Sequence, residues 1–118
     1  MPPPVLRCLP EGQRCGETTA GSRRQALARA ALNQSWLRDA AVVVVFTAIY
    51  ARTTRKYGKR GIRYVHMEVG HAAQNLYLQA EAQALGTVVV GAFRDAEVSK
   101  VLGLPADTQP LTLMPIGR

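Results

Sequence analysis

The sequence predicts one domain of the α+β or α/β class, and three stretches carry this prediction. Residues 41–49 (AVVVVFTAI) and 87–93 (TVVVGAF) are short, continuous, β-branched apolar runs. Such runs are typical of strands that are buried on both faces of a sheet. Between them, residues 62–85 repeat apolar residues at helical spacing, which predicts one long helix. A chain of 118 residues is long enough for one compact domain and too short for two.

The first third of the chain contains a weak strand signal followed by a helix signal. Residues 1–21 are rich in Pro, Gly and small polar residues, so we expect an irregular or edge segment. Within it, VLRCL at residues 5–9 has the composition of a short strand that Pro10 and Gly12 would stop. Residues 22–40 contain strong helix formers after Ser22, a plausible N-cap, and predict one helix.

Glycines divide the remaining elements. Residues 50–61 are expected to form a short helix or turn that ends at Gly58 and Gly61. Gly86 is a natural residue to close the helix over 62–85. That helix has two apolar surfaces, which places it in the centre of the domain or in a subunit interface. The first surface contains Ile62, Val65, Val69, Ala72, Ala73, Leu76 and Ala80, and the second contains Tyr64, Met67, Leu78 and Leu85.

The last part of the chain predicts a helix and a strand. Residues 95–103 form the helix, with Asp95 as its N-cap and Gly103 as its stop. Residues 110–117 (PLTLMPIG) form the final strand. Helices and strands therefore alternate along most of the chain.

Composition limits the class of protein. Hydrophobic residues make up 47% of the chain, which is enough for a core. No apolar run reaches the roughly 20 residues of a membrane-spanning helix, and the N-terminus lacks the apolar stretch of a signal peptide. We therefore expect a cytoplasmic protein. The net charge of +7 is compatible with nucleic-acid binding, but aromatic residues are only 6% and do not alternate with basic ones.

The cysteines and histidines do not predict a metal site. Cys8 and Cys15 are separated as C-x6-C with no second pair, which is poor zinc spacing and a weak disulfide signal, so free thiols are expected. His66 and His71 are not spaced i, i+4 and do not share one helix face.

Several segments together resemble a known family. They are LNQSWLRDAAVVVVFTA, RTTRKYGKRGIRY, GHAAQNLYLQA and GAFRD, in this order. The chain from residue 22 to 118, and more faintly back to residue 5, resembles the nitroreductase superfamily. The likeness is closest to the SagB-type dehydrogenases, FMN-dependent flavoproteins that include thiazoline and oxazoline dehydrogenases.

The resemblance implies a nitroreductase-like α+β sandwich that works as an intertwined homodimer, with FMN at the dimer interface and the long helix packed against its twin. It covers only the C-terminal half of such enzymes. Their N-terminal half carries an R-x-S-like motif that holds the FMN phosphate and a PSAGALYP-like segment near the flavin. We therefore expect residues 22–118 to be a half-domain that follows an irregular segment, and a companion chain is a candidate source of the other half.

The resemblance also implies site residues. Lys56 and Tyr57 match the family's Lys-Tyr pair near the substrate, where the lysine would act as base and the tyrosine would donate or relay a proton. The alternative is a solvated lysine beside a half-buried tyrosine at a helix end. Val89, Val90 and Gly91 lie on the strand that meets the flavin ring edge in the superfamily. The alternative for Gly91 is a glycine that ends a strand.

The basic run over residues 52–63 has three interpretations: a rim around cofactor and substrate, a solvated face, or a nucleic-acid patch. The resemblance favours the first. The implied function is an oxidoreductase that oxidises an azoline-type or related peptide or small-molecule substrate by hydride transfer to FMN. The alternative is a truncated, non-catalytic nitroreductase-like subunit or partner protein.

Overall fold

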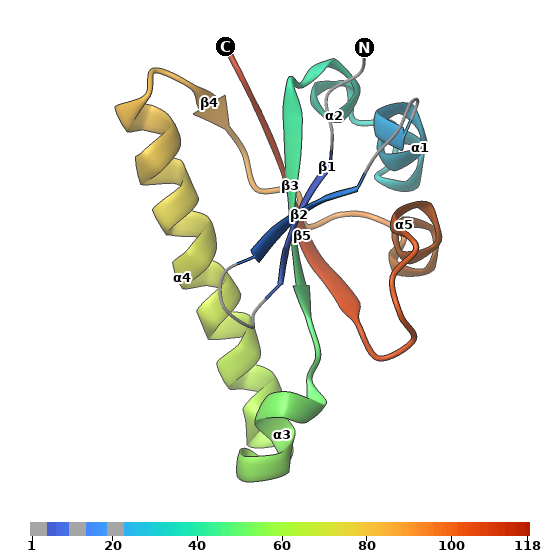
Figure 1. The fold of residues 1–118 in the computed structure, drawn as a ribbon, viewed down its shortest axis with the longest axis vertical. Helices are drawn as coiled ribbons and strands as arrows, with labels where there is room; N and C mark the ends of the chain where they lie inside the picture. Colours follow the sequence, from blue (N-terminus) through green and yellow to red (C-terminus); the bar gives the residue numbers. More distant parts are fainter. Residues whose placement is uncertain (1–4, 10–13, 19–22) are drawn as a thin grey trace.

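A computed structural model describes the backbone of residues 5–9 and 14–18 and all of residues 23–118. These residues form one five-stranded sheet with helices on both sides (Figure 1). The elements are β1 (Val5–Leu9), β2 (Arg14–Thr18), α1 (Arg23–Ala30), α2 (Ser35–Asp39), β3 (Val42–Ala48), α3 (Ala51–Tyr57), α4 (Arg60–Ala82), β4 (Gly86–Thr87), α5 (Asp95–Leu102) and β5 (Gln109–Gly117).

The sheet has the strand order β2-β1-β3-β5-β4. β1 is parallel to β3, and the other neighbouring pairs are antiparallel. The strand expected at residues 5–9 is confirmed as β1. Its partner β2, an edge strand, was not predicted individually within the segment expected to be irregular or an edge. Cys8 and Cys15 are register partners in the β1–β2 pair. Pro10, Gly12 and Ser22 lie outside the described residues.

Two apolar cores lie on opposite faces of the sheet. On one face α1, α2 and α5 cover the sheet, and on the other face α4 runs along it (Figure 1). Val43 and Val45 of β3 belong to the core beneath α1, α2 and α5, whereas Val44 belongs to the core beneath α4. β3 is therefore buried on both faces, as its continuous apolar run predicted.

The prediction of a single helix over residues 22–40 is wrong, because this segment forms two helices, α1 and α2. Leu32 and Asn33 have φ of 59°, in the left-handed region, where a helix cannot continue. Gln34 holds this turn in place, since its side-chain amide donates to the carbonyls of Ala31 (2.8 Å) and Ala92 (3.0 Å). The break is thus fixed by a tertiary contact with the segment before α5.

Gly58 ends α3, but Gly61 does not, because it lies within the first turn of α4. Gly58 adopts φ of 60° and its N–H donates to the Thr54 carbonyl (2.7 Å). Gly61 is buried, and a Cβ on it would lie 3.1 Å from backbone atoms of Thr53 and Thr54. Gly61 therefore allows α3 to lie close against α4, where a Cβ would force the backbone of α3 to shift by a few tenths of an ångström.

Gly61→Ala is expected to destabilise the protein by about 1–3 kcal/mol, because the new methyl group meets backbone rather than a flexible side chain. Chemical unfolding measures this. Gly70→Ala is the matched control on the same helix, since its Cβ would meet nothing within 4 Å. It should stabilise the protein by up to about 1 kcal/mol through helix propensity. Equal stability of the two variants would disprove the close α3–α4 contact.

The end of α4 also differs from expectation. The helix closes at Ala84, which has φ of 57°, and not at Gly86, which belongs to β4. The Leu85 N–H donates to the Ala80 carbonyl (2.9 Å) and the Ala84 N–H to the Glu81 carbonyl (3.0 Å). This is the bond pattern of a Schellman cap, here with alanine in the position that glycine usually takes.

The prediction of a second buried strand over residues 87–93 is wrong. Only Gly86–Thr87 and an isolated bridge at Val90 pair with β5, and Val88 and Val89 are exposed. The hydrogen-bonded pair at Val90 and Leu113 places the next such pair at Val88 and Pro115. Pro115 has no N–H to donate, so the ladder is interrupted there.

The last two elements follow the prediction closely. α5 begins at Asp95, although its N-cap is Arg94 and not Asp95. It ends at Gly103, which adopts φ of 63° as a C-terminal glycine does. β5 occupies the predicted region. None of the helices in the described part of the chain is long and apolar enough to cross a membrane.

Candidate functional site

Lys56 and Tyr57 occupy the end of α3, immediately before the Gly58 turn. The Lys56 Nζ lies 5.3 Å from the centroid of the Tyr57 ring, within cation–π range. The Tyr57 ring packs edge-to-face against Tyr64 of α4 at 5.2 Å. Both side chains of the predicted pair are exposed, Tyr57 to 48%. The structure thus brings the predicted pair together on the surface, at the junction of α3 and α4.

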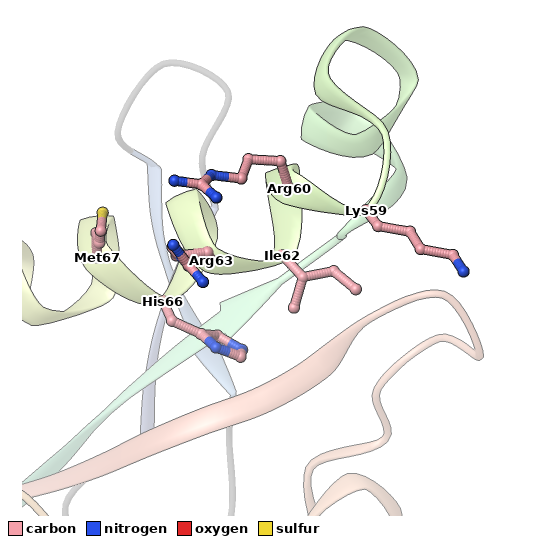
Figure 2. A pocket seen from close by; sticks show the side chains of 6 residues that line it. All are labelled: Lys59, Arg60, Ile62, Arg63, His66 and Met67. Atoms are coloured by element: carbon pink, nitrogen blue, oxygen red, sulfur yellow. The ribbon is translucent and has the colours of Figure 1, made fainter.

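A groove runs along the first half of α4, next to this pair but not lined by it (Figure 2). Its lining residues are Lys59, Arg60, Ile62, Arg63, His66 and Met67. Figure 2 shows Ile62 and His66 leaving the helix on the side of the sheet strands, and Arg60 and Met67 leaving it on the opposite side. The basic run seen in the sequence therefore divides into the Lys56–Tyr57 end of α3 and a cationic groove on α4.

One hydrogen bond beside this groove was not predicted from the sequence. The Tyr50 hydroxyl and the His66 Nε2 are 2.7 Å apart, and their rings meet edge-to-face at 5.6 Å. Burial raises the pKa of Tyr50, and the negative charge of Asp95 raises it further. Tyr50 and His66 belong to different elements and follow no spacing rule, so no sequence pattern could have identified the pair.

Because the pKa of Tyr50 is raised, its phenol is expected to ionise at a pH above the usual value of 10.0. Because the folded state favours the neutral phenol, this contribution to stability is complete below the unfolded pKa of 10.0 and is lost as pH rises through the higher folded value. The difference in ultraviolet phenolate absorbance between the wild type and Tyr50→Phe is expected to have its midpoint above pH 10. A midpoint at or below pH 10 would contradict the partial burial of Tyr50 and the effect of Asp95.

The predicted flavin-edge segment is fixed from two sides of the sheet. The Val89 N–H donates to the Tyr77 hydroxyl (2.7 Å), and the Val90 N–H and carbonyl pair with Leu113 (2.8 and 3.0 Å). On the other side, the Ala92 carbonyl accepts from Gln34 (3.0 Å). The positioning residues Tyr77 and Gln34 were missed by sequence reasoning, because each acts on a segment distant in the chain.

Gly91 is an exposed member of that segment. A Cβ placed on it would meet nothing within 4 Å, and among the described residues its backbone groups have no hydrogen-bond partner. The glycine therefore leaves an accessible stretch of backbone between two anchored residues. Such a stretch can receive a planar ligand and hydrogen-bond to its edge.

No metal centre is apparent in the residues that the structure describes, where no three His, Cys, Asp or Glu side chains gather as ligands. Potential polar ligands at the site are instead the cations of the groove, the Tyr50–His66 pair and the backbone at Gly91.

A comparison with known protein families identifies the family of this chain. Residues 3–118 match the model of the nitroreductase family. The chain belongs to the nitroreductase family. The mixed arrangement of helices around the sheet is accordingly a nitroreductase-like fold, as the resemblance implied.

Similar proteins include members from archaea and bacteria. A Methanocaldococcus jannaschii protein with the name "putative nitroreductase" is 55% identical over 92 residues, which are 78% of this chain and 46% of that protein. The NADPH:FMN oxidoreductase of Vibrio harveyi, solved in complex with NAD+, is 31% identical with a TM-score of 0.72. That match covers 86% of this nitroreductase-family chain and 47% of the Vibrio chain.

A third similar structure is a chain of a synthetase complex. A chain of the E. coli microcin synthetase McbBCD complex, solved with truncated pro-MccB17 bound, is 26% identical with a TM-score of 0.73. The match covers 93% of this chain and 42% of that one. This nitroreductase-family chain therefore spans about half the length of the curated relatives it matches.

Proposed function

We propose that this chain is a catalytic part of an FMN-dependent oxidoreductase of the SagB type. The observation that carries the proposal is the Lys56–Tyr57 pair, held at the α3–α4 junction by Gly58 and by the Tyr57–Tyr64 contact. The likeness to a chain of a microcin synthetase complex supports an azoline-type peptide, or a related small molecule, as the substrate.

The residues present fit a flavin at the segment before α5. Gly91 leaves open backbone beside Val89 and Val90, whose own N–H groups are already used within the chain. Gly91 is thus the residue that would bond to a flavin edge, while Val89 and Val90 hold it in place. Bound FMN supplies the two-electron acceptor of the oxidation. The relatives named as flavin oxidoreductases support FMN as the cofactor.

In the proposed reaction, Lys56 removes a proton from the substrate carbon and Tyr57 donates or relays a proton nearby. In the chain alone the Lys56 amine is solvated. A base of this kind works best where a ligand or a second subunit excludes water from it. The exposed end of α3 is therefore proposed to become covered when substrate and partner are in place.

We propose that the partner is a second copy of this chain, packed through α4, in a cytoplasmic homodimer. α4 buries few of its residues within the chain and leaves large apolar ones exposed, with Leu78 exposed to 61%. Large apolar side chains that a long helix leaves exposed are candidates for burial against a partner. A dimer of this kind has the same patch on both subunits.

Leu78→Glu is expected to shift the protein from dimer to monomer, because the substitution places a charge in the proposed apolar interface. Light scattering coupled to size exclusion measures the mass. Gln79→Glu is the matched control, since it adds the same charge at an adjacent exposed position. If the two variants have the same mass as the wild type, α4 is not the dimer interface.

A second candidate function is a non-catalytic nitroreductase-like subunit or partner protein. It is favoured by the exposure of Lys56 and Tyr57, which do not line the groove on α4. In this case a companion chain would carry the catalytic groups, and the present chain would supply the sheet and α4.

One assay separates the two functions. The purified chain, supplied with FMN and an azoline-containing peptide under oxygen, is analysed by mass spectrometry for loss of two hydrogens from the peptide. The oxidoreductase proposal predicts this loss, whereas no loss with flavin demonstrably bound would leave the non-catalytic subunit as the supported function.

A further inference from the structure

Arg60 and Arg63 stand one helical turn apart at the start of α4, and Lys59 precedes them. In Figure 2 the guanidinium group of Arg60 extends along the helix toward Met67, and Arg63 lies between these two residues. Residues three apart are neighbours on a helix surface. The two guanidinium groups can therefore bind one ligand together.

The described side chains provide no acid for these cations. Arg38 pairs with Asp39, Arg94 with Glu97 and His71 with Glu68. Glu68 is the acid nearest to the two arginines in the sequence, and its Oε1 lies 3.8 Å from Nδ1 of His71. The charge of Asp95 acts on Tyr50, where it raises the pKa of the phenol. The groove consequently presents positive charge that the described acids leave uncompensated.

The type of cation selects the ligand chemistry. Arginine forms paired, planar hydrogen bonds that match phosphate oxygens. Two arginines and a lysine suit a group with more than one negative charge better than a single carboxylate. Ile62 and Met67 add exposed apolar surface beside the cations, which suits the organic part of a phosphate ester.

The Tyr50–His66 hydrogen bond adds a neutral donor to the groove. When the Tyr50 hydroxyl donates to Nε2 of His66, the neutral ring carries its proton on Nδ1. His66 lines the groove on the side of the sheet strands, so the bond to Tyr50 decides which ring nitrogen is the donor there. Tyr50 thereby acts as a positioning residue for the imidazole.

We propose that this groove is a binding site for the phosphate or diphosphate group of a phosphate ester, held by Arg60 and Arg63. The proposal does not depend on the oxidoreductase chemistry, because phosphate binding is measured without turnover. It also concerns a different surface from the Lys56–Tyr57 pair and Gly91.

Calorimetric titration of the full chain with inorganic pyrophosphate tests the site. The double variant Arg60→Gln/Arg63→Gln is expected to bind about tenfold more weakly for each charge-assisted hydrogen bond lost. The control is Arg29→Gln/Arg55→Gln, which makes the same change in net charge at two exposed arginines outside the groove. It should change affinity by less than about twofold. Circular dichroism verifies that both variants are folded.

Equal weakening in the two double variants would overturn the proposal, because it would show general attraction to a basic protein. Unchanged binding in the groove variant would overturn it as well. Paired ligands then identify the source of the phosphate. A preference for FMN over riboflavin that the groove variant loses indicates the flavin phosphate, and a preference for ADP over adenosine that it loses indicates a nucleotide.

Discussion

Lys56→Ala is expected to lower the turnover of the flavin-loaded protein by about 100- to 10,000-fold, the range for loss of a general base. Lys56 lies at the end of α3 beside Tyr57, and its side chain is exposed, so the substitution should leave the fold intact. Turnover is measured as azoline oxidation, with FMN occupancy and unfolding followed in parallel.

Two further variants separate the role of the amine from that of its charge. Lys56→Arg keeps the positive charge but cannot accept a proton at neutral pH, so it should be as inactive as Lys56→Ala. Arg55→Ala removes a neighbouring exposed cation of the same helix and should keep activity close to that of the wild type. Full activity in Lys56→Arg would show that Lys56 acts through charge and is not the base.

Leu113→Ala is expected to destabilise the protein by about 2–5 kcal/mol, the usual range for a fully buried leucine. Leu113 is 0% exposed, belongs to the core beneath α1, α2 and α5, and pairs through its backbone with Val90. Its loss should therefore also loosen the segment that presents Gly91. Chemical unfolding measures the first effect, and FMN affinity measures the second.

Leu32→Ala is the control for this substitution, because Leu32 is exposed and the chemical change is the same. It should change the free energy of unfolding by less than about 0.5 kcal/mol. A cost for Leu113→Ala as small as that for Leu32→Ala would mean that β5 is not the centre of the core.

Elements whose signals were local could be predicted from the sequence. The apolar run of β3 indicated burial on both faces, and Val43, Val44 and Val45 divide between the two cores in that way. The periodicity of residues 62–85 indicated a long helix with more apolar surface than one chain covers, and α4 leaves Leu78 exposed.

Features that depend on distant contacts could not be predicted in this way. The break between α1 and α2 relies on Gln34 reaching Ala92, and the interruption of the strand after β4 relies on Pro115 in a strand far along the chain. Both segments have the local composition of the regular elements expected there. Sequence periodicity contains no information on either contact.

The candidate site also contains residues that a local sequence motif identifies and residues that only folding brings together. Lys56 and Tyr57 are adjacent in the chain, so a motif could identify them, and their functional role stays a prediction. The Tyr50–His66 hydrogen bond joins different elements and appears only in the folded chain. The basic run was visible in the sequence, but its division into the Lys56–Tyr57 end and the α4 groove was not.

The central claim is that this chain builds an FMN site as a homodimer. The most direct test is an absorption spectrum of the purified chain with and without added FMN, recorded together with its mass in solution. The account predicts a dimer that retains yellow flavin after removal of free FMN, and weaker retention in Gly91→Val. A colourless protein that does not bind added FMN would contradict the claim.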